Sequence, residues 1–250
     1  MTDAQVLAGR SAVVAGGSRG IGAGIARGLA AAGSMVTVWA RDPAVPGSPA
    51  GEGDGYGVVC DVRSRSSVAA AVTETIRHRG HIDVLVVAAG RGGSDRLFPD
   101  EPDEDWDDII ATNLTGAFNV VKPVASHMIE RGQGGKIILV SSIAADFAMP
   151  RAVGYAAAKA AFRGFTRSVA AALARHDIQV NSVLPGWVRT DMTRGMLAER
   201  DQEMRLVHRT PARRLGTPED VAGVCVYLAS EASRFHTGDE ICIDGGFSIV

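Results

Sequence analysis

The sequence predicts an α/β fold, in which a single doubly wound domain over residues 1–250 contains a parallel sheet of about seven strands with helices on both faces. Three observations predict it. A chain of 250 residues with 46% hydrophobic residues can bury one large core. Short runs rich in β-branched residues alternate with longer alanine-rich helical patterns, as in a parallel sheet connected by helices. A glycine-rich turn follows the first short run, where open parallel sheets bind their ligands.

Each short apolar run is expected to be a buried strand, because turn residues bound it and it is too short for a helix. The strands are expected at 11–15, 35–40, 56–60, 84–89, 136–141, 178–184 and 240–244. The helices between and after them are expected at 20–32, 64–79, 103–131, 154–175 and 218–229. Between the second and third strands, the stretch 42–57 carries three prolines and five glycines, which predicts a surface loop in place of a crossover helix.

Composition and charge exclude several classes of function. The formal net charge of −2 gives no basic field for nucleic acid and no polybasic stretch for anionic lipid. No run stays apolar for the eighteen or so residues that a membrane helix needs, and the first ten residues do not resemble a signal peptide, so we expect a cytoplasmic protein. Three scattered cysteines and six histidines without metal-ligand spacing predict neither disulfides nor a metal site.

The first predicted strand is followed by "AGGSRGIG", which contains Gly16, Gly20 and Gly22. Glycines let the backbone turn tightly and approach a pyrophosphate, which the free N–H groups at the start of the next helix then stabilise. A tight turn without a ligand is the alternative in a glycine-rich chain. The position of the motif between a strand and a helix favours the nucleotide site.

A second candidate site lies in "YAAAK", where Tyr155 and Lys159 stand four residues apart. On a helix these positions share one face, so the phenol and the ammonium can point into the same space. Tyrosine and lysine at this spacing are usually no more than a solvated pair, so the spacing alone leaves both interpretations open.

Several separated motifs together resemble the short-chain dehydrogenase/reductase family over nearly the whole chain, most closely its 3-oxoacyl-carrier-protein reductase branch. The motifs are "GGSRGIG" (16–22), "CDV" (60–62), "TNLTGAF" (112–118), "ILVSS" (138–142), "YAAAK" (155–159), "NSVLPGWVRTDM" (181–192), "RRLGTPEDVAGVCVYLAS" (213–230) and "TGDEICIDGG" (237–246). The resemblance implies a Rossmann fold and an oxidoreductase that interconverts a ketone and a secondary alcohol.

The resemblance also implies a catalytic tetrad, which in this sequence is Asn113, Ser142, Tyr155 and Lys159. Ser142 is preferred to its neighbour because the family's serine lies thirteen residues before the tyrosine. Hydride transfer leaves negative charge on a carbonyl oxygen, which Tyr155 protonates and Ser142 hydrogen-bonds. The ammonium of Lys159 is expected to lower the pKa of Tyr155 and to reach the nicotinamide ribose, while Asn113 holds a water of the proton relay.

The cofactor itself supplies the hydride, and the resemblance implies which residues bind it. Asp61 would accept a hydrogen bond from the adenine amino group, although a turn residue at a strand end is the alternative. The chain turns at Pro185 and Gly186, so that the backbone of Val188 and the hydroxyl of Thr190 meet the carboxamide. The full predicted set is Gly16, Ser18, Arg19, Gly20, Ile21, Gly22, Arg41, Asp61, Val62, Ala89, Gly90, Tyr155, Lys159, Pro185, Gly186, Val188 and Thr190.

The choice of cofactor rests on "VTVWARDP" (36–43). An acidic side chain after the second strand selects NAD, whereas a cation accommodates the 2′-phosphate of NADP. The acidic position falls on Ala40, and Arg41 follows it, which predicts NADP(H) in preference to NAD(H). The alternative makes Asp42 the ribose acceptor, two positions late and beside a proline that restricts its backbone.

The sequence departs from the family pattern at two neighbouring strands. Ala15 replaces the usual threonine before the first glycine, and Val87 and Ala88 replace two asparagines after the fourth strand. Because the first and fourth strands of such a sheet are neighbours, losing polar groups on both leaves no single group unpaired. We therefore expect an apolar repacking in which each change compensates the other.

The segments expected to line the substrate pocket contain no motif that identifies a particular ketone. Its walls are expected from Gly92–Phe98, Asp146–Pro150 and a lid over about 191–212. The arginines of 194–214 could attract an acidic carrier, but interleaved acids favour a solvated helical face. The expected partner is a small carbonyl or alcohol, such as a 3-oxoacyl thioester.

Two other functions stay open at this stage. A lyase or dehalogenase on the same fold would dispense with the glycine turn, and a nucleotide-binding or scaffolding subunit would carry a damaged tetrad. The chain keeps both the glycine turn and the intact tetrad. A measurement of NADPH binding by fluorescence distinguishes a dehydrogenase from these two alternatives.

A homotetramer is expected, because helices 103–131 and 154–175 carry more apolar residues than one sheet face can cover. Those counted are Ala117, Phe118, Val121, Ala156, Ala157, Ala160, Ala161 and Phe162.

Overall fold

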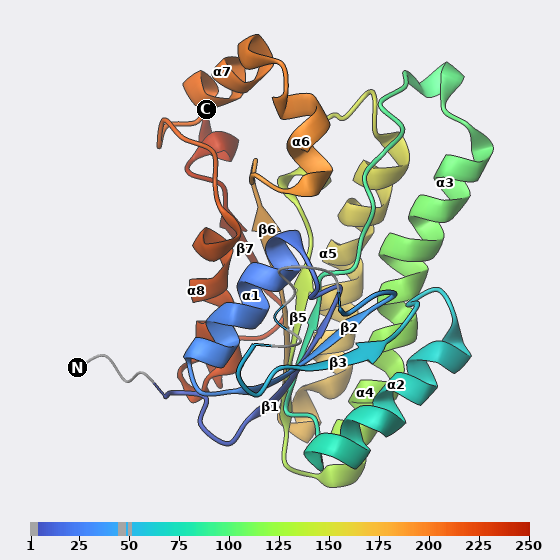
Figure 1. Cartoon of the computed structure of the whole chain (residues 1–250), viewed down its shortest axis with the longest axis vertical. Coiled ribbons are helices and arrows are strands. Elements are labelled where there is room, and N and C mark those ends of the chain that lie inside the picture. The colour runs from blue at the N-terminus through green and yellow to red at the C-terminus, as the bar shows by residue number, and fades with distance from the viewer. Residues whose placement is uncertain (1–4, 45–48, 50–51) are drawn as a thin grey trace.

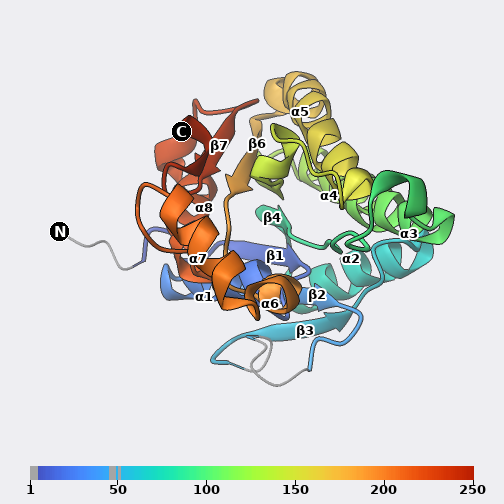
Figure 2. The same ribbon diagram turned by 90° about the horizontal axis from the view of Figure 1, so that it is seen from above.

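The protein is seen here as a computed structural model that describes residues 5–44, 49 and 52–250. A parallel sheet in the order β3-β2-β1-β4-β5-β6-β7 crosses the molecule (Figures 1 and 2). Its strands are β1 (Ser11–Ala15), β2 (Met35–Ala40), β3 (Tyr56–Val59), β4 (Val84–Val87), β5 (Gly135–Val140), β6 (Ile178–Pro185) and β7 (Glu240–Ile243). The seven parallel strands confirm the predicted fold class, with strand order reversing between β1 and β4.

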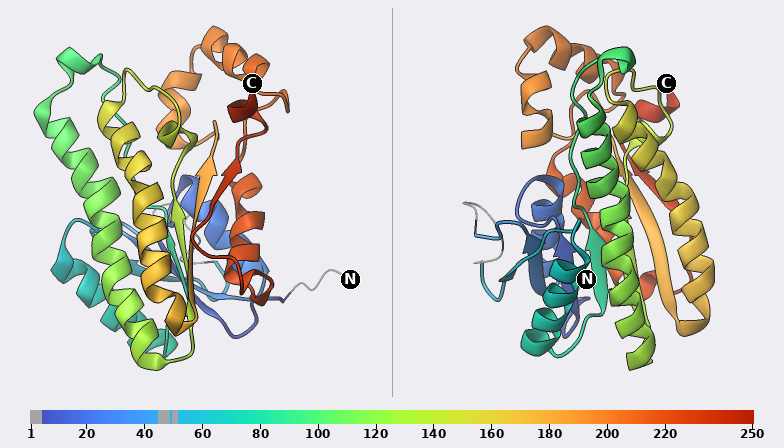
Figure 3. Two further views of the ribbon diagram at one scale, coloured as in Figure 1. Left: turned by 180° about the vertical axis from the view of Figure 1, so that it is seen from behind. Right: turned by 90° about the vertical axis from the view of Figure 1, so that its right-hand side faces the viewer.

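Helices cover both faces of the sheet, and each face has its own apolar core (Figure 3). On one face, α1 (Gly20–Ala31) packs against α8 (Pro218–Ala229) and contributes Ile25 and Leu29 to a core that includes Val221. The other face is covered by α2 (Arg65–Arg79), α4 (Gly116–Arg131) and α5 (Val153–Leu173), which bury Val68, Val120 and Phe162. Burial on both faces explains why the central strands are almost continuously apolar.

The helix predicted over 103–131 is wrong in one respect, because a π-helical stretch interrupts it. The chain forms α3 (Asp103–Ile109), a π-helix (Ile110–Thr115) and then α4. π-Helical turns insert an extra residue into a helix and are often found at functional sites. Here the stretch contains Asn113, a predicted member of the tetrad.

No α-helix occurs in the described part of the segment 42–57, in agreement with the expected loop. Residues 42–44 and 52–54 form bends and turns before β3 begins at Tyr56, while 45–48 and 50–51 lie outside the described residues. β3 is an edge strand of four residues, on which Val59 is 68% exposed.

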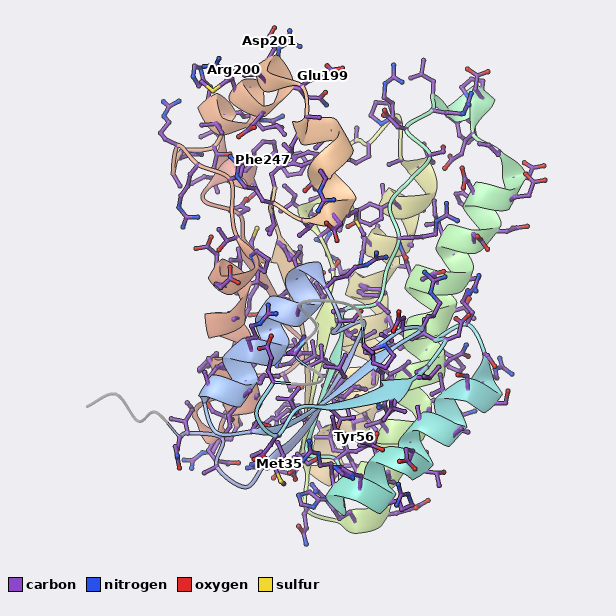
Figure 4. The ribbon with its side chains drawn as sticks, in the orientation of Figure 1. Met35, Tyr56, Glu199, Arg200, Asp201 and Phe247 are labelled. Atoms are coloured by element: carbon purple, nitrogen blue, oxygen red, sulfur yellow. The ribbon has the colours of Figure 1, made fainter. Side chains whose placement is uncertain are left out.

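Two short helices, α6 (Asp191–Leu197) and α7 (Arg200–Arg209), lie beyond the carboxyl end of the sheet (Figure 1). They occupy the segment that the sequence predicts as a lid. Figure 4 shows Glu199, Arg200 and Asp201 at the outer tip of this pair, far from the strands.

Short 3-10 turns follow several elements, at Phe98–Asp100, Ile143–Ala145, Ala174–His176, Glu231–Ser233 and Phe247–Ile249. No helix of the described residues has the length and apolar character needed to cross a membrane.

The apolar residues expected to be surplus on the α4 and α5 helices divide into two groups. Ala117, Val121 and Phe162 are buried against the chain's own sheet, so the prediction that they need a partner is wrong. Phe118 is 42% exposed, and Ala157 and Ala160 are also exposed. Helical periodicity explains the division, because one face of each helix meets the sheet while the opposite face looks outward.

Candidate active site

A cleft of about 760 Å³ opens at the carboxyl end of the strands, where strand order reverses. It brings together most of the predicted site residues from six separated parts of the chain. The predicted residues that line it are Gly16, Ser18, Arg19, Gly20, Ile21, Gly22, Arg41, Asp61, Val62, Ala89, Gly90, Tyr155, Lys159 and Thr190. The glycine turn and the Tyr155–Lys159 pair therefore face the same space.

The turn between β1 and α1 has no room for side chains at two of its glycines. Gly16 has a φ of +83°, and a Cβ built on it would lie 2.5 Å from the backbone nitrogen of Ala89. A Cβ on Gly22 would lie 2.1 Å from the carbonyl oxygen of Gly16. The turn therefore presents backbone to the cleft at the start of α1, the chemistry that suits a dinucleotide pyrophosphate.

The departures from the family pattern are compensated as expected. Ala15 on β1 is the register partner of Val87 on β4, and both side chains are buried in one apolar core. The backbone nitrogen of Ala88 donates to the carbonyl oxygen of Ala15 over 2.8 Å. Because apolar groups meet apolar groups here, the changes leave no polar partner unsatisfied.

Lys159 is held on α5 beside the end of β5. Its Nζ donates to the carbonyl oxygen of Val140 over 2.7 Å and lies 5.7 Å from the centre of the Tyr155 ring. Burial lowers the pKa of Lys159 to about 8, because an ammonium loses solvation in the cleft wall. Ser141 has a packing role, since its buried hydroxyl donates to the carbonyl oxygen of Lys159 over 3.2 Å.

The direction of the pKa shift at Tyr155 differs from the expectation. Burial raises the pKa of Tyr155, and a hydrogen bond with Ser142 opposes that rise. The expected lowering by Lys159 is absent, and the ammonium of that residue donates to the carbonyl oxygen of Val140 instead. The phenol is thus held in its protonated form at neutral pH.

Ser142 stands at the junction of β5 and the 3-10 turn at Ile143–Ala145. Its hydroxyl accepts a hydrogen bond from the backbone nitrogen of Ala144 over 3.1 Å, which caps the turn. The same hydroxyl bonds to Tyr155. The serine is therefore fixed in place beside the phenol.

Asn113 is completely buried and fastens the loop after β4 to the π-helix. Its Oδ1 accepts from the backbone nitrogen of Arg91 over 2.8 Å, and its Nδ2 donates to the carbonyl oxygen of the same residue over 2.9 Å. The position beside Gly90 brings it near Lys159, since a Cβ on that glycine would lie 3.4 Å from Asn113 Oδ1 and 3.9 Å from Lys159 Nζ. Asn113 thus attaches the loop at Arg91 to the π-helix, close to Lys159 on α5.

Asp61 lies at the adenosine end of the cleft with its carboxylate already engaged. Arg63 donates to it from Nη2 over 2.7 Å, from Nε over 3.1 and 3.2 Å, and from its backbone nitrogen over 3.0 Å. The hydrogen bond from Arg63, with a smaller effect from the charge of Arg41, lowers the pKa of Asp61. A carboxylate oxygen has two lone pairs, so Asp61 keeps capacity for an adenine amino group.

Arg41 is exposed at the lip of the cleft, directly after the half-buried Ala40. The neighbouring Asp42 accepts a hydrogen bond on Oδ1 from the backbone nitrogen of Ala44 over 3.0 Å, so its carboxylate is used in a turn. Both Arg41 and Asp42 line the cleft.

Five predicted residues are not among those that line the cleft: Asn113 and Ser142, whose contacts are given above, and Pro185, Gly186 and Val188. Gly186 and Val188 line a separate pocket of about 150 Å³, and Pro185 ends β6 behind it. The side chain of Val188 is buried, and its carbonyl oxygen accepts from the hydroxyl of Thr193 over 2.8 Å. Of the expected substrate walls, the cleft includes Gly92 and residues at the start of α6 but none of 146–150.

Sequence reasoning missed two arginines of the cleft. Arg63 orders the carboxylate of Asp61, and its place two residues after that aspartate was a usable signal. Arg91 directly follows the predicted Gly90, lines the cleft and pairs with Asp105 over 2.6 Å and Asp108 over 2.8 Å. The two acids that pair with Arg91 lie fourteen and seventeen residues away in the sequence, so local patterns do not reveal these ion pairs.

Comparison with known proteins agrees with the geometry. Residues 15–248 match the family model described as enoyl-(acyl carrier protein) reductase. The 3-oxoacyl-[acyl-carrier-protein] reductase MabA of Mycobacterium tuberculosis is 40% identical, over 96% of this chain and 93% of that protein. The gluconate 5-dehydrogenase of Gluconobacter oxydans is 36% identical, over 97% of this chain and 96% of that protein.

Solved structures show the same architecture. A gluconate 5-dehydrogenase from Burkholderia cenocepacia, crystallised with NADP and tartrate, superposes with a TM-score of 0.91 at 36% identity, covering 99% of this chain and 98% of that one. Family model, relatives and fold all agree with the cleft described above. The chain therefore belongs to the short-chain dehydrogenase/reductase family and is an oxidoreductase that acts on CH–OH groups.

Proposed function

We propose that this protein reduces a small ketone to a secondary alcohol with NADPH and catalyses the reverse oxidation with NADP⁺. The observation that carries the proposal is that Tyr155 and Lys159 line the same cleft as the glycine turn. The turn suits the pyrophosphate, and the tyrosine stands where a carbonyl next to the nicotinamide end would need a proton donor.

Three of the four predicted catalytic residues have distinct tasks in this proposal. NADPH, when bound, supplies the hydride. Tyr155 donates its phenolic proton to the carbonyl oxygen, which its raised pKa favours at neutral pH. Ser142, held by Ala144, hydrogen-bonds that oxygen and fixes its position. Lys159 places a cation beside the phenol and stabilises the phenolate that remains.

The proposed preference for NADP(H) rests on Arg41. A guanidinium at the lip of the cleft can bind the 2′-phosphate in bidentate fashion, whereas Asp42 stands two positions after Ala40 and uses one carboxylate oxygen in a turn. A charge-assisted hydrogen bond of about 1.5–3 kcal/mol corresponds to roughly ten- to a hundredfold in affinity.

Cofactor choice is tested by measuring the binding of NADPH and NADH to Arg41→Ala and to the matched variant Asp42→Asn. We expect Arg41→Ala to weaken NADPH by roughly ten- to a hundredfold with little change for NADH. Asp42→Asn should leave both affinities near wild type. Equal losses for the two cofactors in Arg41→Ala, or a wild-type enzyme that prefers NADH, would contradict the proposal.

The substrate is proposed at the level of a class. Relatives include enzymes named for 3-oxoacyl thioesters and for gluconate, so both kinds of ketone belong in the assay. A panel that contains acetoacetyl thioesters and 5-keto-D-gluconate, followed by NADPH absorbance, should identify at least one ketone that is consumed. A protein that neither binds NADPH by fluorescence nor oxidises it with any ketone would reject the proposed function.

A further inference from the structure

The feature that carries a further inference is a stacked arginine at the end of α7, beyond the carboxyl end of the sheet (Figure 1). Arg209, the last residue of α7, has its guanidinium carbon 4.2 Å from the ring centre of Phe247 and 5.6 Å from that of Phe147. The two rings meet edge to face at 5.8 Å. Figure 4 shows Phe247 below α7, between that helix and the carboxyl end of the sheet.

Neither ring lines the cleft itself: Phe147 belongs to the segment that continues beyond Ser142, and Phe247 to the turn that follows β7. Phe147 lies five residues after Ser142, just beyond the 3-10 turn that this serine caps. Phe247 is buried and also contacts Trp187, three residues before the cleft residue Thr190. Arg209 therefore stands where the lid, the loop after β5 and the C-terminal turn meet.

Three other arginines in or beside the lid pair with acids, whereas Arg200 and Arg205 on α7 have neither an acid partner nor a ring contact among the described residues. Arg189 pairs with Glu203, Arg194 with Asp191, and Arg214 with Asp220.

Arg209 differs from the three paired arginines, because within the described residues no carboxylate and no carbonyl oxygen accepts a hydrogen bond from it. The acids on the adjoining segments have partners of their own. Asp146 pairs with Arg163, and Asp244 accepts from the backbone nitrogens of Gly246 and Ser248 over 2.9 and 2.7 Å.

Stacking on an aromatic face fixes the plane of a guanidinium while leaving its N–H groups at the edge available. Such a cation is pre-organised to bind a carboxylate or phosphate with two parallel hydrogen bonds, and little side-chain entropy remains to be lost. Arg209 is exposed, so an incoming anion can reach that edge.

We infer that Arg209 binds an anionic group of the ketone substrate, at the end remote from the reacting carbonyl. This inference rests on the proposed function and narrows its substrate class to ketones that carry a carboxylate or a phosphate. The two sources share the same bidentate chemistry, and paired substrates distinguish them.

The experiment compares wild type with Arg209→Met on two charged and neutral pairs. 5-Keto-D-gluconate is paired with its methyl ester, and acetoacetyl-coenzyme A is paired with acetoacetyl-N-acetylcysteamine. We expect Arg209→Met to raise KM at least about tenfold for the charged member of one pair, with a smaller change in kcat and no change for its neutral partner. The pair that responds identifies the anion as carboxylate or phosphate.

Two further variants separate charge recognition from a structural role. Arg209→Lys keeps the charge but not the planar fork and should recover part of the lost affinity. Arg205→Met lies one turn earlier on α7, has no ring contact among the described residues, and should match wild type. Equal effects of Arg209→Met on charged and neutral substrates, or no effect on either, would overturn the inference.

A binding measurement tests the role of Arg209 independently of whether the protein reduces ketones. Calorimetric titration of the NADPH-loaded protein with gluconate and with coenzyme A requires no turnover. One of the two should bind wild type about tenfold or more tightly than Arg209→Met. Equal binding to both proteins overturns the role of Arg209, whereas absence of ketone reduction alone overturns the proposed function.

Discussion

At Tyr155 two environmental effects oppose each other. Burial raises the pKa of the phenol, and the bond with Ser142 lowers it, with burial the larger of the two. A protonated phenol at neutral pH suits a general acid, which is the role needed for ketone reduction.

Tyr155→Phe removes the proton donor while keeping the ring, so it should retain cofactor binding and lose most turnover. General acid catalysis contributes about 10²–10⁴-fold, and a loss of that size is expected in kcat for reduction. NADPH fluorescence gives the binding and NADPH absorbance the rate. Tyr227→Phe, on the exposed side of α8, is the matched control and should be unaffected. Near-normal turnover in Tyr155→Phe would refute the assigned role.

The pH dependence should differ between the two directions of the reaction. Reduction needs the phenol protonated, so a raised pKa keeps kcat for reduction constant through neutral pH. Oxidation needs the phenolate, whose fraction rises about tenfold per pH unit below the pKa, so its rate should still be rising near pH 9. Lys159, with a pKa of about 8, is charged at neutral pH. Steady-state profiles in both directions check this, and an oxidation rate already maximal near neutrality would contradict it.

Sequence could name the tetrad but not its surroundings. The types and spacing of Tyr155 and Lys159 are local, so a resemblance carries them directly. The partner of Asp61 lies two residues away in the sequence, whereas the partner of Asn113 depends on how loops meet in space. Arg63 engages the first, and the backbone of Arg91, twenty-two residues from Asn113, engages the second.

At the scale of single elements, the turn between β1 and α1 is the least tolerant of change. Gly22→Ala would place a Cβ 2.1 Å from the carbonyl oxygen of Gly16, which forces the backbone of the turn to move. We expect NADPH affinity to fall by about tenfold or more, together with a loss of stability of about 1–3 kcal/mol for overpacking.

Gly164→Ala is the matched control, because it lies on α5 with no atom within 4 Å of its added Cβ. It should be neutral or gain about 0.5–1 kcal/mol from helix propensity. Denaturant unfolding and NADPH titration measure both variants. Similar outcomes for the two glycines would show that the turn does not need its close approach.

The boundaries of most elements follow from local signals, whereas the π-helix does not. α8 begins where Pro218 follows Thr217, whose side chain joins Asp220 in a capping box, and the sequence alone places that helix at its observed bounds. The residues of 110–115 have the same apolar spacing as a continuous helix. Their π conformation accompanies the tertiary contacts of Asn113, which no local pattern encodes.

For the whole molecule, the order of strands and the two-faced burial follow from the alternation of strands and helices. The alternation does not tell which apolar helix residues the chain buries against its own sheet. The same apolar spacing describes helix faces that contact the sheet and faces that remain exposed. Phe162 and Phe118 illustrate this, since the first is 1% exposed and the second 42% exposed.

We predict a homotetramer in which the exposed face of α4 and α5, with Phe118, Ala157 and Ala160, packs against symmetry mates. Light scattering at micromolar concentration should report four chains for wild type. Phe118→Glu should shift the mass toward smaller species, because it places a charge within an apolar contact. Val59→Glu, at the 68% exposed position on edge strand β3, should leave the mass unchanged. A wild-type monomer would contradict the prediction.

The two hydrogen bonds between Asn113 and the backbone of residue 91 affect how the substrate loop of such enzymes can change in sequence. The amide binds the N–H and the C=O of that residue, and no hydrogen bond joins it to the Arg91 side chain among the described residues. Every amino acid except proline offers those two groups, so the anchor survives almost any replacement at position 91. The loop that starts at residue 91 can therefore change in sequence to accept a new ketone while Asn113 keeps its first residue attached to the π-helix.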